Sequence, residues 1–232
     1  MTVKRIGIIG ALDGEVESLI SKLEEREEIL VGGILFHCGR LLGKEIIVAK
    51  CGVGKVFAAM CAEAMIIRFS PDLVVNTGVG GAIAKDIKVL DIIIAERLVQ
   101  HDMDTSPLGD PKGLISGINK IYFETDEHAK ELLLAAAEEC GIKARGGTVA
   151  SGDVFVASRE MKERIAADFG ADACEMEGAA IAHVCFVNAT PCVVIRAISD
   201  SADDSSSMDY LQFLPLAARN SSLITEKLIE RF

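Results

Sequence analysis

Residues 175–200 read EMEGAAIAHVCFVNATPCVVIRAISD. An Ala-rich stretch of helical character, Gly178–Val187, is followed closely by an aliphatic run, Cys192–Asp200, that is typical of a buried strand. The same order recurs earlier, where the helix expected at Lys55–Phe69 precedes the run Leu73–Gly80. Strands that alternate with helices of this length indicate an α/β protein with a mainly parallel sheet and helices on both faces.

Further elements extend this pattern over the whole chain. We expect further strands at 5–11, 34–39, 45–52, 91–99 and 147–157, and further helices at 126–140, 160–169 and 210–232. There is no repeat, linker or low-complexity tract, so the pattern predicts one domain over residues 1–232. Two stretches lack periodicity: Gln100–Lys120, whose length is typical of a functional loop, and Ser201–Ser207, which is a candidate lid.

The charge balance limits the classes of function. The 232 residues carry 35 acidic and 24 basic side chains, a formal net charge of −11, and the basic residues form no cluster. An acidic surface repels phosphate backbones, so we expect no nucleic-acid partner. No uninterrupted apolar segment reaches about 18 residues, which predicts that no helix spans a membrane.

Cysteine and histidine usage indicates a compartment and argues against a metal site. The seven cysteines form no C-x-x-C pair, and several lie inside apolar runs. Free, buried thiols of this kind are typical of a reducing cytosol, so we expect a cytoplasmic protein. The four histidines share no ligand spacing, so we expect no metal. The N-terminal apolar run ends at Asp13, too early for a signal peptide.

Glycines gather where the predicted strands end, which is the edge of an open α/β sheet at which ligands bind. Three strand ends carry the turns GIIGALDGE, KCGVGK and NTGVGG. Together they suggest a backbone that approaches a flat ligand closely, although any one of them could be only a strand-to-helix turn. None has the spacing of a P-loop or of a dinucleotide-binding motif.

Charged residues lie at the same strand ends. Glu15 follows the first strand, Glu177 opens a helix, and Asp200 ends a buried strand. Each acid has a simpler interpretation, as a group that stabilises or caps a helix N-terminus. Arg196 lies inside an aliphatic strand and needs a buried anionic partner, for which Glu15, Glu175 and Glu177 are the candidates.

With these residues in view, the chain resembles the methylthioadenosine/S-adenosylhomocysteine nucleosidases of the nucleoside phosphorylase superfamily. The segments that carry the resemblance occur in the family's order over nearly the whole chain: GIIGALDGEV, CGVGKVFAA, NTGVGGAI, HDMD, SGDVF, EMEGAAIAHV and VVIRAISD. It implies a three-layer α/β/α fold around a mixed, partly barrel-like sheet, and a homodimer. It also implies hydrolysis to adenine and 5-methylthioribose or S-ribosylhomocysteine, as in methionine salvage, without metal or organic cofactor.

The same resemblance implies a role for each acid. Glu15 would activate water, Glu177 would hold the ribose hydroxyls, and Asp200 would protonate the purine. Other predicted substrate contacts surround adenine, the ribose and an apolar pocket for the 5′-substituent: Gly81, Phe155, Val156, Met176, Arg196, Ser199, Leu12, Val53 and Tyr210. Leu108 would reach into the site of a partner subunit.

Four positions or segments depart from the family's pattern. Val79 stands where a serine near the attacking water is usual, which would leave Glu15 and Arg196 to hold that water. Tyr210 replaces a usual phenylalanine, and TSPLGDPKG differs from the family's aromatic-bearing loop, so the preferred 5′-substituent stays open. Asp13-Gly14 replaces an acidic pair and could loosen the turn before Glu15.

The chemistry of a nucleoside explains why three acids would be needed. Its glycosidic carbon reacts through a ribosyl cation, so adenine must leave with a proton and negative charge must lie beside the sugar. Asp200, kept protonated by burial, would donate to adenine N7, and an ionised Glu177 would stabilise the cation. A carboxylate at Glu15 would repel phosphate, which argues against phosphorolysis.

Three alternatives stay open at this point. A purine nucleoside phosphorylase would depend on phosphate. A futalosine-type nucleosidase would differ in the 5′-substituent that it accepts. A non-catalytic nucleoside sensor would not require a buried general acid, so the three carboxyl groups argue against it.

Overall fold

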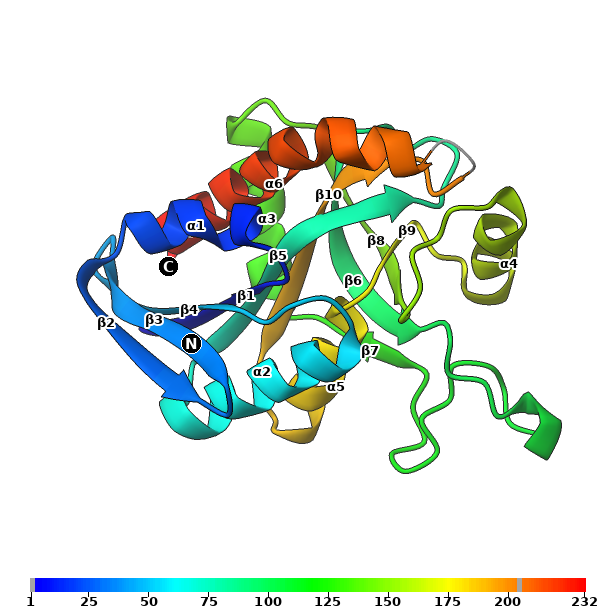
Figure 1. The fold of residues 1–232 in the computed structure, drawn as a ribbon, viewed down its shortest axis with the longest axis horizontal. Helices are drawn as coiled ribbons and strands as arrows, with labels where there is room; N and C mark the ends of the chain where they lie inside the picture. Colours follow the sequence, from blue (N-terminus) through cyan, green and yellow to red (C-terminus); the bar gives the residue numbers. More distant parts are fainter. Residues whose placement is uncertain (1–2, 204–205) are drawn as a thin grey trace.

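The computed structural model describes residues 3–203 and 206–232, whose strands form one mixed sheet between helices (Figure 1). The strands are β1 (Arg5–Gly10), β2 (Glu24–Val31), β3 (Ile34–Leu41), β4 (Lys44–Lys50), β5 (Leu73–Ala82), β6 (Ile92–Gln100), β7 (Tyr122–Glu124), β8 (Ala144–Ser151), β9 (Ala173–Glu175) and β10 (Cys192–Asp200). The helices are α1 (Asp13–Ser21), α2 (Lys55–Phe69), α3 (Glu127–Glu139), α4 (Arg159–Phe169), α5 (Gly178–Val187), α6 (Ser206–Arg231) and the short 3₁₀ helix η1 (Ser106–Leu108).

Strand β5 is the centre of the sheet because it pairs with three neighbours. Its first half pairs in parallel with β1, at Ile6–Ile9, and β10 runs parallel along its other edge. Beyond Asn76, β5 leaves β1, and its end pairs antiparallel with β9 at Gly81 and Ala82. Since β10 pairs with β6, β6 with β8 and β8 with β9, these strands and β5 close into a barrel.

The closed part of the sheet confirms the expectation of a mixed, partly barrel-like sheet, and it corrects the simpler expectation of a mainly parallel one. Antiparallel pairs join β2 to β3 and β3 to β4, because tight turns at Gly32–Gly33 and Leu42–Gly43 replace the helix that a parallel crossover needs. Barrel closure adds the antiparallel pairs β10–β6 and β5–β9.

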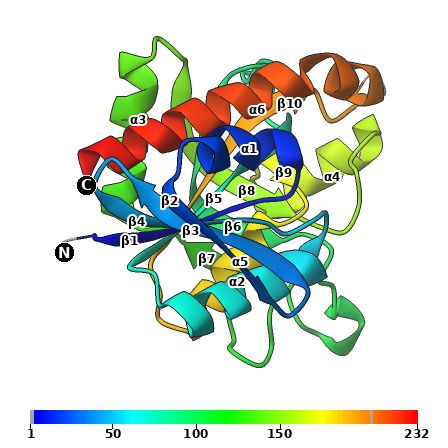
Figure 2. The same ribbon diagram turned by 60° about the vertical axis from the view of Figure 1, so that its left-hand side comes forward.

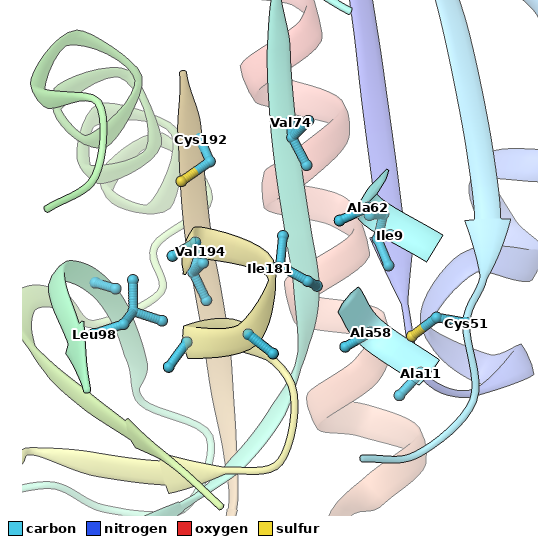
Figure 3. Close-up of a cluster of buried hydrophobic side chains, with 14 of the residues drawn as sticks. Ile9, Ala11, Cys51, Ala58, Ala62, Val74, Leu98, Ile181, Cys192 and Val194 are labelled. Atoms are coloured by element: carbon cyan, nitrogen blue, oxygen red, sulfur yellow. The ribbon is translucent and has the colours of Figure 1, made fainter. Parts of the chain in front are cut away.

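Helices cover the sheet on two faces, as Figures 1 and 2 show. Helices α1, α3 and α6 bury apolar side chains such as Val16, Leu133 and Ile224 against the face that carries Ile8. Helices α2 and α5 cover the opposite face with small residues; Figure 3 shows Ala58 and Ile181 against the strands. Small side chains let these two helices lie close to the sheet and to each other.

Several element boundaries differ from the sequence prediction. The strand expected at 147–157 runs from Ala144 to Ser151, so residues 152–157 form a loop instead. The last helix begins at Ser206 rather than at 210, inside the stretch predicted as a lid, and residues 204–205 of that stretch lie outside the described part of the chain. In the part that is described, no helix has the length and apolarity needed to cross a membrane.

Candidate active site

The three acids singled out by the sequence line one cavity, at the place where β5 separates from β1. The cavity has about 550 Å³ of empty space, part of it open to solvent. The ends of β1, β5, β9 and β10 form its floor, with Glu15, Glu177 and Asp200 among the lining residues. Nearly all predicted substrate contacts line it as well: Leu12, Val53, Gly81, Phe155, Val156, Met176, Ser199 and Tyr210.

Glu15, in the first turn of α1, is held by main-chain N–H groups. Its Oε2 accepts from the N–H groups of Ala11 (2.7 Å) and Leu12 (2.9 Å), and its Oε1 accepts from the N–H of Val79 (3.0 Å). The Val79 N–H is available because β5 has already left β1 at that point. Burial raises the pKa of Glu15, against the lowering effects of Arg196 and of these bonds. Glu15 is therefore a fixed carboxyl group of increased basicity.

Glu177 precedes α5, and its side chain accepts one hydrogen bond from the described residues, from the Gly54 N–H to Oε1 at 2.8 Å. Burial, followed by the negative charge of Glu175, raises the pKa of Glu177 to about 7. Arg196 opposes this shift but does not contact Glu177 directly. The Glu177 carboxyl group thus titrates near neutral pH beside the cavity.

Asp200, the last residue of β10, is 3% exposed. Its Oδ1 accepts from the Ala202 N–H at 2.9 Å, and the Ser199 hydroxyl donates to its Oδ2 at 2.9 Å. Burial raises the pKa of Asp200, and the nearby carboxylates of Asp209 and Asp203 act in the same direction. Burial thus stabilises the protonated form relative to an exposed carboxyl group, although the bonds from Ala202 and Ser199 act in the opposite direction; the protonated form is the one that can donate to a ligand.

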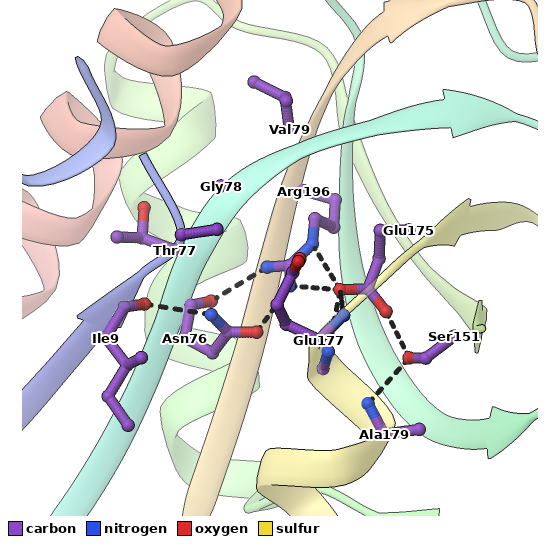
Figure 4. Close-up of polar contacts among 12 residues, drawn as sticks. Ile9, Asn76, Thr77, Gly78, Val79, Ser151, Glu175, Glu177, Ala179 and Arg196 are labelled. Carbon is purple, nitrogen blue, oxygen red and sulfur yellow. Dashed lines mark hydrogen bonds and ion pairs between the residues drawn. The ribbon is translucent and has the colours of Figure 1, made fainter. Parts of the chain in front are cut away.

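A buried polar layer borders the cavity and comprises Arg196, Glu175, Asn76 and Ser151 (Figure 4). Of these residues, Glu175 also lines the cavity. Arg196 donates to Glu175 through Nε (3.2 Å) and Nη2, and its other N–H groups donate to Asn76 and to the Ile195 carbonyl. Burial alone would raise the pKa of Glu175, but the Arg196 guanidinium and bonds from Ser151 and Gly178 hold it below its usual value. Of the three anionic partners considered for Arg196, the structure selects Glu175.

This geometry changes the expectation for Arg196 itself. Every N–H group of the guanidinium has an acceptor within the protein, and Arg196 does not line the cavity. A direct contact with substrate or with the attacking water would break one of these buried bonds. Arg196 instead fixes Glu175, whose Oε2 also accepts from the N–H groups of Glu177 (2.9 Å) and Gly178 (2.7 Å).

The glycines of NTGVGG make room for the acids rather than for a ligand alone. A Cβ atom at Gly78 would lie 2.8 Å from Glu15 Oε1, and one at Gly81 would lie 2.8 Å from Asp200 Oδ1. Gly54 has φ of 100°, a backbone conformation that favours glycine, and this turn points its N–H at Glu177. The glycine-rich strand ends thus position the carboxyl groups.

Apolar side chains form the outer wall of the cavity. The rings of Phe155 and Tyr210 meet edge to face, with centroids 5.5 Å apart. Phe155 is 43% exposed and Val53 is 50% exposed, so this side is open in the single chain. Leu108, on η1, is 84% exposed and is not among the residues that line this chain's cavity.

Sequence reasoning did not assign roles to Asn76, Ser151 and Gly54. Asn76 and Ser151 are polar residues inside predicted strands, and Gly54 follows the end of one; a polar side chain inside an aliphatic run is the signal that could have found the first two. Glu175 was considered only as a partner of Arg196. Within residues 3–203 and 206–232, no His, Cys, Asp and Glu side chains form a group that could hold a metal ion.

Comparison with known proteins gives consistent matches over the full length. The family model described as the phosphorylase superfamily matches residues 5–230. An aminodeoxyfutalosine nucleosidase of Helicobacter pylori is 39% identical over 98% of this chain and 99% of its own. A 5′-methylthioadenosine/S-adenosylhomocysteine nucleosidase of Haemophilus influenzae is also 39% identical, with the same coverage. The nucleosidase of that name from Neisseria meningitidis, solved with methylthio-immucillin-A, is 34% identical with a TM-score of 0.96, over 99% of this chain and 100% of that one.

Proposed function

This chain belongs to the phosphorylase superfamily, and we propose that it is a hydrolase of that family that cleaves the N-glycosidic bond of 5′-methylthioadenosine and S-adenosylhomocysteine. The products are adenine and 5-methylthioribose or S-ribosylhomocysteine. The proposal is supported by the full-length relatives of that name and by the three carboxyl groups that share the cavity.

The position of Glu15 is the observation that favours water over phosphate as the nucleophile. Three main-chain N–H groups, from Ala11, Leu12 and Val79, converge on one point at the ends of β1 and β5. Such a set of donors would otherwise suit an anion such as phosphate. The Glu15 carboxylate already occupies it, so a phosphate dianion would meet both a filled site and a negative charge.

Glu15 retains the capacity to act on water. A carboxylate offers about four acceptor positions, and the three N–H bonds leave one of them on Oε1, beside the cavity. A water molecule that donates to this position loses its proton to Glu15 as its oxygen attacks the ribosyl carbon. The raised pKa of Glu15 makes the carboxylate a better base for this step.

Asp200 and Glu177 act on the other two parts of the substrate. Asp200, protonated, donates its proton to N7 of adenine, so the base leaves as a neutral molecule. Glu177, ionised, accepts hydrogen bonds from the ribose hydroxyls and places negative charge beside the developing cation. Met176, Phe155 and Val156 enclose the ribose and adenine.

A second candidate substrate is supported by one relative. The Helicobacter pylori protein named aminodeoxyfutalosine nucleosidase matches this chain as well as the methylthioadenosine relatives do. The two kinds of substrate differ at the 5′-substituent, which would face the wall formed by Leu12, Val53, Phe155 and Tyr210. The reaction and the roles of the acids are the same for both.

We also propose a cytoplasmic homodimer. Large apolar side chains of α2 and α5 are exposed in the single chain: Val56, Phe57, Met60, Ile67, Phe186 and Val187. A second copy would cover this face, and Leu108 of the projecting loop would close the open side of the partner's cavity. Sedimentation tests the oligomeric state, and we expect a dimer for the wild type. A separate binding measurement tests the Leu108 contact, and we expect Leu108→Asp to bind substrate more weakly.

Adenine release from a panel of nucleosides, with and without phosphate, tests the function. The panel contains 5′-methylthioadenosine, S-adenosylhomocysteine, 5′-deoxyadenosine and aminodeoxyfutalosine. We expect release that does not depend on phosphate and a free reducing sugar as the second product. Formation of a ribose 1-phosphate would instead identify a phosphorylase, and binding without release would identify a nucleoside sensor.

A further inference from the structure

The motif HDMD contributes no residue to the cavity wall. Its Asp102 nevertheless forms hydrogen bonds with Lys55 and Asp153, which belong to two segments that line the cavity. Lys55 Nζ donates to Asp102 Oδ1 at 2.6 Å, and the Asp153 N–H donates to Asp102 Oδ2 at 2.9 Å. The ring of contacts closes where the Lys55 N–H donates to Asp153 Oδ1 at 2.7 Å. We call Lys55, Asp102 and Asp153 the lysine clamp.

The clamp is partly shielded from water. The Lys55 side chain is 17% exposed and that of Asp102 is 29% exposed. Lys55 Nζ has a further acceptor in Gln100 Oε1 at 3.2 Å, and Gln100 in turn contacts His183 at 3.3 Å. An ion pair with several bonds and restricted exposure keeps a defined geometry better than an isolated surface pair does.

Two of the three clamp residues, Lys55 and Asp153, are adjacent in sequence to residues that line or orient the cavity. Lys55 follows Gly54, whose N–H contacts Glu177, and Val53 lines the cavity one residue earlier. Asp153 precedes residues 154–156, which line the cavity on the side of Phe155. The clamp therefore joins the turn that orients Glu177 to the loop that encloses the nucleoside.

The turn before Lys55 needs an external restraint. Gly52 and Gly54 have φ values of 93° and 100°, and glycines restrict the backbone least. Gly54 is the N-cap of α2 and has no side chain to cap the helix, so the Asp153 carboxylate, from a distant part of the chain, accepts from the first helical N–H. Without that tie, little would fix the direction of the Gly54 N–H.

We propose that the lysine clamp is a positioning unit for the proposed hydrolysis: it holds the Gly54 N–H on the Glu177 carboxylate and holds the Phe155 loop against the bound nucleoside. Its residues act through Gly54 and Phe155 and do not touch the substrate. The inference rests on the proposed function, because it assigns the clamp to that reaction.

Three variants test the clamp: Lys55→Met, Asp102→Asn and the conservative Lys55→Arg. The control is Asp168→Asn, which removes the partner of Lys112 from an ion pair of 2.5 Å that lies outside the cavity. We expect Lys55→Met and Asp102→Asn to raise KM between roughly 10-fold and 100-fold, because small misplacements of binding groups have effects of that order. The double variant Lys55→Met/Asp102→Asn should have a KM no higher than that of the more affected single variant. Lys55→Arg should have a KM close to that of the wild type.

The pH profile separates positioning from simple stabilisation. Glu177 is faced by Glu175, Arg196 and Glu15, which all remain in these variants, and by the Gly54 N–H, which lowers its pKa. Loss of that bond should move the acid limb of kcat/KM to higher pH in both variants, and the control should leave it unchanged. A fall in Tm with an unchanged KM and an unchanged acid limb would overturn the proposal.

Binding of a non-hydrolysable methylthioadenosine analogue, measured by calorimetry, keeps the two proposals distinct. If the wild type releases adenine and the variants bind the analogue normally, the clamp proposal is rejected and the proposed hydrolysis is kept. If the wild type binds the analogue without releasing adenine from any nucleoside, the function fails, and weaker binding by the variants still measures the clamp.

Discussion

Glu175 and Glu177 are two residues apart, yet they belong to regions with opposite properties. Both line the cavity, but Glu175 is paired with Arg196 in the buried polar layer, which holds its pKa below the usual value. At the cavity wall, Glu177 has a single backbone donor, and burial raises its pKa to about 7. A buried acid with a cationic partner fixes structure, whereas a buried acid without one is available to exchange protons. Substitutions in the two regions should therefore differ in what they damage.

The largest effect on turnover is expected for Glu15→Gln. Glutamine keeps the shape of the side chain but cannot take a proton from water, so hydrolysis should fall to below roughly one thousandth of normal. Adenine release measures this, and Asp13→Asn, on the exposed side of the same helical turn, is the control. If Glu15→Gln still hydrolyses substrate at a normal rate, water is activated elsewhere.

Asp200→Asn should reduce kcat by roughly two to three orders of magnitude, because an amide cannot donate the proton that adenine needs. The amide oxygen can keep the bond from the Ala202 N–H, and the Ser199 hydroxyl, which lies 3.4 Å from the Gly80 carbonyl, can donate to that carbonyl and accept from the new amide N–H. Substrate binding and Tm should therefore change little. Binding and single-turnover measurements separate the two quantities. Near-normal turnover would exclude Asp200 as the acid.

Glu175→Gln tests the other region and should affect stability first. It leaves Arg196 buried at 1% exposure without its anionic partner, which should lower the free energy of unfolding by about 3–5 kcal/mol. Urea unfolding measures the change, with Glu27→Gln on the exposed strand β2 as the control. A loss of activity with wild-type stability would contradict the division between the two regions.

The pH dependence sharpens the same comparison. If Glu177 must be ionised, kcat/KM should fall about tenfold per unit as pH drops below about 7. Because the folded-state pKa lies above the usual 4.5, protonation of Glu177 favours the folded state as pH falls from about 7 towards 4.5. Unfolding caused by protonation of Glu177 therefore does not explain the fall in kcat/KM. Circular dichroism at each pH checks that the protein stays folded. A profile that is flat across this range would remove Glu177 from the mechanism.

Tyr210→Phe should have the smallest effect. It removes one hydroxyl from the outer wall and keeps the ring that contacts Phe155 at 5.5 Å. The ratio of kcat/KM for S-adenosylhomocysteine and 5′-methylthioadenosine should change by no more than about tenfold, the range of one hydrogen bond. An unchanged Tm is expected, and a large fall in kcat for both substrates would show that Tyr210 contacts the reacting part of the nucleoside.

Sequence patterns predicted the elements that consist of long apolar runs. Helices α2 and α5 have the predicted bounds because Ala-rich segments follow glycine turns there. The core strands β5 and β10 were found because each contains an aliphatic run. Strand β2, EEREEILV, was missed because it is a charged edge strand, mostly exposed, whose charges discourage pairing with other molecules. The closure of the barrel depends on pairings between distant strands that no local pattern contains.

The site was predicted from the position of acids at strand ends, and the structure brings Glu15, Glu177 and Asp200 into one cavity. The partner of Arg196 could not be chosen, because Glu15, Glu175 and Glu177 all lie near strand ends in the sequence. The choice follows from the antiparallel pairing of β9 with β5, which places the Glu175 side chain beside β10. The partner of Arg196 is therefore determined by the pairing of distant strands, which residue types alone do not reveal.

The donors around Glu15 belong to the main chain, so they persist whatever side chain occupies position 15. In Glu15→Ala, the N–H groups of Ala11, Leu12 and Val79 would point into a vacant space with nothing to neutralise them. A small external acid such as formate could enter that space and restore part of the lost turnover. The backbone would then serve as a receptor for a replaceable base, and the same three donors could accept a phosphate ion in the emptied space.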